Sequence, residues 1–137
     1  MSEPTYLGRC LCGGIQYRAV GPWRNLCNCH CESCRRAAGA PYVAWGTIDR
    51  ERLELVHGQF TVVRSSREVR RGFCGQCGTT LTYSHTARAN EIDVTLASLE
   101  DPAALAPQAH IWVQDKLPWV PIDDDLPKYK AAYGIDA

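Results

Sequence analysis

Short runs in which apolar and polar residues alternate recur along the chain, and turn residues separate them. In Ile15-Gln16-Tyr17-Arg18 and in Ile92-Asp93-Val94-Thr95-Leu96 the apolar side chains occupy every second position. This period of two is typical of β-strands that bury one face and leave the other in water. The pattern therefore predicts a mainly β protein of small antiparallel sheets. The runs expected to form strands are Gly14–Val20, Tyr42–Thr47, Leu53–His57, Phe60–Arg64, Val69–Phe73, Thr80–Ser84, Glu91–Thr95 and His110–Val113.

Helical periodicity is scarce in this chain. The three helices that we expect are Glu32–Ala38, Asp101–Leu105 with a proline in its first turn, and Lys128–Tyr133, which Gly134 would end. His57-Gly58 lies between two expected strands and predicts a hairpin turn. The run Asp123-Asp124-Asp125 lies in a proline-flanked segment, where we expect solvated side chains and assign no chemistry.

The length of 137 residues fits a single domain, which we expect to span residues 1–137. The N-terminus has no basic stretch followed by an apolar run, and no segment approaches the roughly 20 apolar residues that span a bilayer. We therefore expect a soluble, cytoplasmic protein that contacts no membrane. The formal net charge is zero, so no overall positive field would draw nucleic acid, whereas small polar substrates fit this charge.

All eight cysteines fall in tight clusters. Sulfur atoms one or three positions apart can bind one tetrahedral metal ion, whereas the neighbours in a Cys-x-Cys pair cannot easily form an unstrained disulfide. In a reducing compartment such cysteines serve as ligands or reactive thiols. The spacing therefore predicts a zinc protein. The clusters are Cys10-x-Cys12, Cys27-x-Cys29-x-Cys31-x-x-Cys34 and Cys74-x-x-Cys77.

The segment Phe73-Cys74-Gly75-Gln76-Cys77-Gly78 has the pattern of a zinc knuckle between two expected strands. Glycine after each cysteine permits positive φ angles, which turn amide hydrogens toward the thiolates. Cys10 and Cys12 offer a matching pair at the start of another strand. We expect these four thiolates to hold one structural zinc, because zinc binding offsets the few kcal/mol that closing a loop of roughly sixty residues costs.

The segment from Cys27 to Cys34 holds more cysteines than a structural knuckle needs. If the stretch is extended, Cys27, Cys29 and Cys31 point the same way, and a short helix from Glu32 could bring Cys34 beside them. Four thiolates on one ion would make a closed structural site. Three thiolates would leave the fourth position to water or substrate, as in catalytic zinc sites. The spacing alone does not choose between these alternatives.

Four sets of residues carry a resemblance to a known family: Cys10-x-Cys12-Gly13, Cys29-His30-Cys31-x-x-Cys34-Arg35-Arg36, Phe73-Cys74-x-x-Cys77-Gly78-Thr79-x-Leu81, and the tail segments His110-x-Trp112-Val113 and Leu117-Pro118-Trp119. They make nearly the whole chain similar to the glutathione-dependent formaldehyde-activating enzymes, which include proteins related to centromere protein V. The resemblance implies a β-tent fold with two zinc ions. The structural zinc would be held by Cys10, Cys12, Cys74 and Cys77, and the catalytic zinc by Cys29, Cys31 and Cys34. Cys27 lies outside that ligand set, where it could fill the fourth position or form a disulfide with a ligand.

The resemblance also implies a carbon–sulfur lyase-type enzyme, similar to S-(hydroxymethyl)glutathione synthase, that condenses formaldehyde or another small aldehyde with glutathione or a similar thiol. Zinc on three thiolates has a formal charge of about −1, which makes it a poor Lewis acid for the aldehyde but a good anchor for sulfur. We therefore expect the zinc to activate the thiol. The candidates to orient the charged groups of glutathione are Arg35, Arg36, Arg70 and Arg71.

The two histidines of the motifs have supporting roles in this interpretation. His30 would point away from a metal ion held by its neighbours, so we expect it to support the site or lie on the surface, and His110 to pack in a strand. Two other classes of protein are also considered. One is a zinc module without catalysis that binds a protein or the thiol adduct; the other uses Cys27 as a nucleophile, like the methionine sulfoxide reductases, which share the β-tent scaffold. A nucleic-acid partner does not suit the neutral charge, and the oligomeric state does not follow from the sequence.

Overall fold

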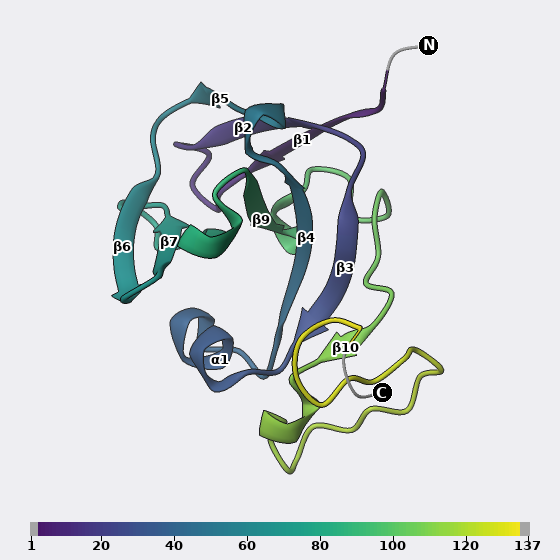
Figure 1. The fold of residues 1–137 in the computed structure, drawn as a ribbon. Coiled ribbons are helices and arrows are strands. Elements are labelled where there is room, and N and C mark those ends of the chain that lie inside the picture. Colours follow the sequence, from purple (N-terminus) through teal and green to yellow (C-terminus); the bar gives the residue numbers. More distant parts are fainter. Residues whose placement is uncertain (1–2, 135–137) are drawn as a thin grey trace.

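The computed structural model describes residues 3–134, which form two β-sheets and one α-helix (Figure 1). The strands are β1 (Thr5–Arg9), β2 (Gln16–Val20), β3 (Arg24–Cys29), β4 (Val43–Asp49), β5 (Leu53–His57), β6 (Thr61–Ser66), β7 (Val69–Phe73), β8 (Thr80–His85), β9 (Glu91–Thr95) and β10 (His110–Ile111). The small sheet has the antiparallel order β1-β2-β5. The large sheet has the order β10-β3-β4-β9-β8-β7-β6, and its only parallel pair in the described residues is β10 with β3. The predicted mainly β fold is confirmed.

Strand β2 has the burial pattern that its sequence predicted. Tyr17 and Ala19 are buried, whereas Arg18 between them faces solvent. Tyr17 packs over Gly8 of β1, where a Cβ atom would come within 2.1 Å of the tyrosine ring. Its hydroxyl lies 2.6 Å from Ser98 Oγ, in the segment after β9. This hydrogen bond attaches the small sheet to the rest of the molecule.

The main hydrophobic core contains residues from both sheets. Tyr17 of the small sheet and Ile48 and Val94 of the large sheet are almost completely buried in it. Cys10 and Cys74 belong to the same cluster. One cysteine of each pair, Cys10 of the first and Cys74 of the second, is therefore fixed in place by the core itself.

Helix α1 (Glu32–Ala38) has the bounds that the sequence predicted. Its N-cap is Cys31, whose sulfur accepts a hydrogen bond from the Cys34 amide at 3.3 Å. Gly39 ends the helix in the left-handed region, with φ of 63°, as is usual for glycine at this position. Because β3 ends at Cys29, the second cysteine cluster lies where a strand turns into a helix (Figure 1).

The hairpin turn predicted at His57-Gly58 is wrong. Strand β5 pairs with β2 in the small sheet and β6 pairs with β7 in the large sheet, so this segment carries the chain from one sheet to the other. Gly58 has φ of 74°, and an added Cβ would lie 2.1 Å from the Gly14 carbonyl oxygen. A close approach of two backbones, and not a two-strand turn, requires glycine here.

Two of the predicted helices are also wrong. Asp101–Leu105 forms a short turn, in which the Asp101 carboxylate accepts a backbone hydrogen bond from two residues further on. Lys128–Tyr133 is not helical because its backbone pairs with β10, where the Tyr129 amide donates to the His110 carbonyl at 2.9 Å. In both segments these contacts replace the hydrogen bonds that a helix would need.

The remaining helical segments are 3₁₀ turns of three residues each, at Arg50–Arg52, Thr86–Arg88, Leu96–Ser98 and Val113–Asp115. Within residues 3–134 no helix has the length and apolar character that crossing a membrane would require.

Candidate metal centres

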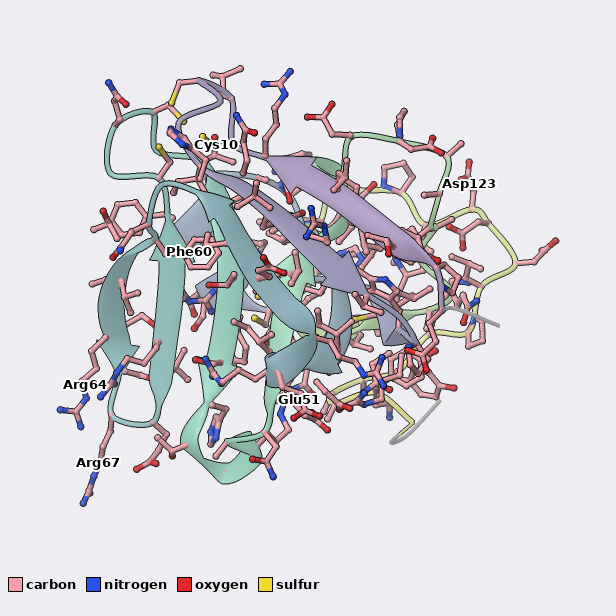
Figure 2. The ribbon with its side chains drawn as sticks, turned by 90° about the horizontal axis from the view of Figure 1, so that it is seen from above. Cys10, Glu51, Phe60, Arg64, Arg67 and Asp123 are labelled. Carbon is pink, nitrogen blue, oxygen red and sulfur yellow. The ribbon has the colours of Figure 1, made fainter. Side chains whose placement is uncertain are left out.

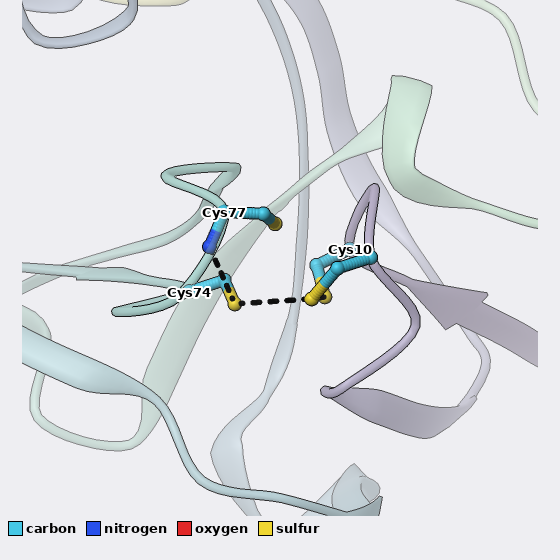
Figure 3. Close-up of side chains that lie close together, drawn as sticks. Cys10, Cys74 and Cys77 are labelled. Carbon is cyan, nitrogen blue, oxygen red and sulfur yellow. Dashed lines mark hydrogen bonds between the residues drawn. The ribbon is translucent and has the colours of Figure 1, made fainter.

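Four cysteines from two loops bring their sulfur atoms together at the end of the molecule opposite the β6–β7 turn, which contains Arg67 (Figure 2). Cys10 and Cys12 follow β1, and the other pair lies between β7 and β8. All four Sγ atoms lie within 4.8 Å of one another, and Figure 3 shows Cys10, Cys74 and Cys77 pointing toward one another. The Sγ of Cys12 is 3.6 Å from that of Cys10 and 3.8 Å from that of Cys74. Zn–S bonds of ~2.3 Å in a tetrahedron place sulfur atoms ~3.8 Å apart. This four-cysteine group, completed by Cys77, can therefore hold one metal ion and fits zinc.

Backbone amides in both loops point at these sulfur atoms. Their nitrogens lie 3.3 or 3.4 Å from sulfur in the pairs Gly14 to Cys12, Ile15 to Cys10 and Cys77 to Cys74. Gly13 and Gly78, each directly after a cysteine, have φ of 78° and 84°. Such amide donors stabilise the charge of thiolates. The predicted positive φ is confirmed at Gly78 but is wrong at Gly75, whose φ is not positive.

Thr79 connects the two halves of the four-cysteine group. Its hydroxyl oxygen accepts a hydrogen bond of 2.9 Å from the Leu11 amide and lies 3.1 Å from Cys77 Sγ. The hydrogen bond from Thr79 lowers the pKa of Cys77 to about 5. Cys77 is thus ionised at neutral pH and ready to bind a cation.

Cys29, Cys31 and Cys34 form a second group, whose Sγ atoms also lie within 4.8 Å of one another. Cys29 ends β3, and the other two belong to the first turn of α1. Cys29 and Cys34 are buried, whereas Cys31 is half-buried. Among residues 3–134 no fourth cysteine, histidine or carboxylate joins this three-cysteine group. It could hold a metal ion with three protein ligands.

The thiols of the three-cysteine group share their protons unequally. Hydrogen bonds from Cys29 and then from Cys34 lower the pKa of Cys31 to about 2, and the bond to Cys31 raises the pKa of Cys29. One thiolate therefore forms at the expense of its neighbours. A divalent cation would favour ionisation of all three thiols, because it adds positive charge where they converge. This donor set suits zinc and other soft cations.

Cys27 belongs to neither group. It is buried in the wall of the cavity that Cys29 and Cys31 also line. Burial raises the pKa of Cys27 to about 12, so its thiol stays protonated at neutral pH. A protonated thiol is a weak nucleophile.

A cavity of about 1130 Å³ opens beside the three-cysteine group. This volume accommodates a ligand the size of a small peptide and far exceeds that of a small aldehyde. Aromatic and charged side chains form much of its wall, among them Trp45, Tyr83, Trp112, Arg36, Arg71, Arg88 and Asp93.

The four arginines predicted to orient glutathione lie in different places. Arg36 and Arg71 line the large cavity. Arg35 donates from Nε to the carbonyl oxygen of His30 at 3.4 Å, and Arg70 lines a separate hollow of about 300 Å³. Only Arg36 and Arg71 therefore lie where a ligand in the large cavity would meet them.

The charged residues of the cavity wall that sequence reasoning missed include Arg88 and Asp93. The Asp93 carboxylate accepts hydrogen bonds from Thr47 Oγ1 at 2.6 Å and from Arg88 at 3.1 Å. The alternation in β9 did place Asp93 on the face opposite Ile92 and Val94, and that face is the cavity wall. The alternation revealed the polar face, but not the side chains from other strands that face it.

His30 lies between two cysteines of the three-cysteine group and is completely buried. Its Nε2 lies 2.9 Å from His110 Nδ1, and His110 Nε2 lies 2.9 Å from an Asp124 carboxylate oxygen. Burial lowers the pKa of His30 to about 4. The aspartate run to which we assigned no chemistry thus contributes Asp124 to a hydrogen-bonded chain that ends beside the cysteines.

Three comparisons relate this geometry to known proteins. The family model described as glutathione-dependent formaldehyde-activating enzyme matches residues 5–115. An uncharacterized lyase of Schizosaccharomyces pombe is 29% identical over 115 residues, which cover 82% of each chain. The crystal structure of a Rhodobacter sphaeroides protein matches with a TM-score of 0.60 at 24% identity, covering 74% of this chain and 97% of the other, so the two share a fold.

The fold and the two cysteine groups define a mainly β protein with two candidate metal centres. The chain belongs to the family of glutathione-dependent formaldehyde-activating enzymes. The family resemblance seen in the sequence is thereby confirmed.

Proposed function

We propose that this protein is a zinc-dependent carbon–sulfur lyase-type enzyme, similar to S-(hydroxymethyl)glutathione synthase, that joins formaldehyde or another small aldehyde to glutathione or a similar thiol. The observation that carries the proposal is the position of the three-cysteine group in the wall of a cavity of about 1130 Å³. Membership of the family and a relative named a lyase support the same class of reaction.

The two metal centres have different roles in this proposal. Zinc on the four-cysteine group would have all its positions filled by protein and would connect the end of β1 to the β7–β8 loop. At the three-cysteine group the protein supplies three positions, and the cavity gives a substrate access to the fourth. A zinc ion there would anchor a sulfur ligand and lower the pKa of its thiol. Because the ligands must stay reduced, we place the protein in the cytoplasm.

The reaction is an addition that needs no oxidant or reductant. The thiol S–H adds across the aldehyde C=O bond, so a C–S bond forms and the thiol proton ends on the new hydroxyl. Glutathione carries two carboxylates, and Arg36 and Arg71 in the cavity wall would orient them by charge-assisted hydrogen bonds. Holding the thiol and the aldehyde side by side would supply the acceleration.

The test must measure a rate, because thiols and formaldehyde also combine without a catalyst. Magnetisation-exchange NMR at equilibrium reports how fast free glutathione and its hydroxymethyl adduct interconvert. We expect the wild type and His57→Gln, an exposed control, to accelerate this exchange, and Cys34→Ser to abolish the acceleration. Exchange that is equally fast with and without the wild-type protein would contradict an enzyme and leave a zinc module that binds the adduct.

The role of zinc in activating the thiol has a separate test. X-ray absorption at the zinc edge should show eight sulfur ligands over the two zinc ions when glutathione is added, against seven in its absence. An unchanged sulfur count at saturating glutathione would contradict a zinc-bound thiolate.

A further inference from the structure

Arg70 and Arg71 are neighbours in β7 with opposite surroundings. Arg71 is only 6% exposed and lines the large cavity, whereas Arg70 is exposed beside the separate hollow. A buried guanidinium group normally has a carboxylate partner, because it cannot lose its charge by deprotonation. Within residues 3–134 the polar contacts of Arg71 include no carboxylate.

The sulfur of Cys34 takes the place of that carboxylate. The two terminal nitrogens of Arg71 lie 4.0 and 3.9 Å from Cys34 Sγ, at the range of N–H···S contacts. Arg71 Nε donates to Ser65 Oγ at 3.3 Å, and the guanidinium carbon lies 5.0 Å from the centre of the Tyr83 ring. The hydrogen bond and the cation–π contact hold the guanidinium with both terminal nitrogens beside one sulfur of the three-cysteine group.

We propose that Arg71 is a positioning residue that balances the negative charge of the three-cysteine metal centre and so permits an anionic thiolate to bind there as the fourth ligand. This inference rests on the proposed function, since it takes the bound metal to be zinc. Three thiolates and one Zn²⁺ ion have a formal charge of −1, and a fourth thiolate makes it −2. Such a charge is unfavourable in a buried site, and the Arg71 guanidinium brings the total back to −1.

The geometry also explains why the residue is an arginine. The planar guanidinium group presents two N–H groups to one sulfur, while its carbon lies over the Tyr83 ring. Lysine would keep the charge without this planar pair of N–H groups, and glutamine would keep a hydrogen-bond donor without the charge. Arg71→Lys and Arg71→Gln therefore separate the two contributions, and Arg70→Gln is a matched control one residue away.

The experiment compares these variants in three measurements that do not involve catalysis. Competition with a chromophoric chelator gives the zinc affinity of each centre, and native mass spectrometry identifies the number of ions retained. In cobalt-substituted protein, the sulfur-to-metal charge-transfer band reports glutathione entering the coordination sphere. Retention of the first metal by the four-cysteine group shows that a variant is folded.

We expect Arg71→Gln to lower the zinc affinity of the three-cysteine centre by about ten- to a hundredfold and to weaken the cobalt response to glutathione. Arg71→Lys should stay within about tenfold of the wild type, and Arg70→Gln should match it. The role of charge would be overturned if Arg71→Gln had the zinc affinity and cobalt response of the wild type. It would also be overturned if Arg71→Lys and Arg71→Gln lost equal zinc affinity. If Arg71→Lys folds and Arg71→Gln does not, a fall of more than about a hundredfold in the zinc affinity of Arg71→Lys would also overturn the role of charge.

The outcome is distinguishable from a failure of the proposed function. A wild type that binds the second metal and the thiol but accelerates no exchange would refute the enzyme and leave the role of Arg71 intact. If the wild type accelerates the exchange, but Arg71→Gln changes neither the zinc affinity of the three-cysteine centre nor its cobalt response to glutathione, only the role of Arg71 is refuted.

Discussion

His30 and His110 share a hydrogen bond of 2.9 Å between their imidazole rings, although eighty residues separate them in the chain. The bond follows from the parallel pairing of β10 with β3, which places the C-terminal part of the chain beside the second cysteine cluster. Asp124 accepts from the far side of His110 at 2.9 Å. Since a carboxylate only accepts, His110 donates through Nε2, and a neutral His110 accepts at Nδ1 from His30.

This arrangement predicts that stability falls in mild acid. The pKa of His30 is about 4 in the folded protein, lowered by burial and then by His110, against 6.5 as its ordinary value. Between those values the unfolded chain binds one more proton than the folded chain. The contribution of His30 is therefore fully present above pH 6.5 and is lost as the pH falls toward 4, to a total of about 3 kcal/mol.

Denaturant unfolding of the wild type and of His30→Gln across this pH range measures the effect. Because acid also releases metal, the quantity to follow is the difference between the two proteins. We expect the wild type to lose more stability than His30→Gln on acidification, and the exposed-residue control His57→Gln to behave as the wild type. Identical pH profiles for the wild type and His30→Gln would contradict a buried neutral His30.

Thr79→Val tests how the four-cysteine group is assembled. The substitution keeps the shape of the side chain and removes the hydroxyl that bridges the Leu11 amide and Cys77 Sγ. We expect the affinity of this group for zinc to fall about tenfold, while the three-cysteine group is unaffected. Chelator competition measures both affinities, with Thr80→Val, one residue along, as the control. A wild-type affinity in Thr79→Val would show that the bridge is dispensable.

Gly46→Ala tests the packing where β4 crosses the core. An added Cβ would lie 2.7 Å from the Trp23 ring and 2.9 Å from the side chains of Leu26 and Leu96. Overpacking of this kind costs typically about 1–3 kcal/mol, more than alanine gains over glycine in a strand. Thermal unfolding should show a lower midpoint temperature. Urea unfolding should show a lower midpoint concentration with an unchanged dependence of the free energy of unfolding on urea concentration. A stabilised variant would mean that the neighbouring side chains move aside freely.

The sequence predicted most of the strands, because alternation reports burial on one face. Gln16–Val20 and Glu91–Thr95 were found in this way. Strands β1 and β3 were missed. In β1, Tyr6 and Leu7 break the alternation and Gly8 is explained only by the Tyr17 ring above it. In β3, four successive residues are buried, so no alternation marks the strand. The C-terminal helix was predicted wrongly, because pairing with β10 outweighs local propensity.

Cysteine spacing predicted that each cluster gathers its own sulfur atoms, because ligands close in sequence are close in space; that Cys10 and Cys12 meet Cys74 and Cys77, over sixty residues away, depends on how the two sheets pack. The spacing did not tell whether Cys27 joins the second group; the structure leaves it outside. Nor could the sequence distinguish Arg71 from Arg70, because the two are adjacent and only the strand's orientation decides which one enters the cavity. Contacts such as His30 with His110 depend on strand pairing and leave no local signal.

Zinc per chain, measured by native mass spectrometry on the wild type, Cys27→Ser and Cys34→Ser, tests the central claim most directly. Two centres, one of four cysteines and one of three, predict two zinc ions in the wild type, two in Cys27→Ser and one in Cys34→Ser. Loss of the second zinc in Cys27→Ser would contradict this. The second centre would then be a closed four-cysteine site, and a structural role would replace the proposed chemistry.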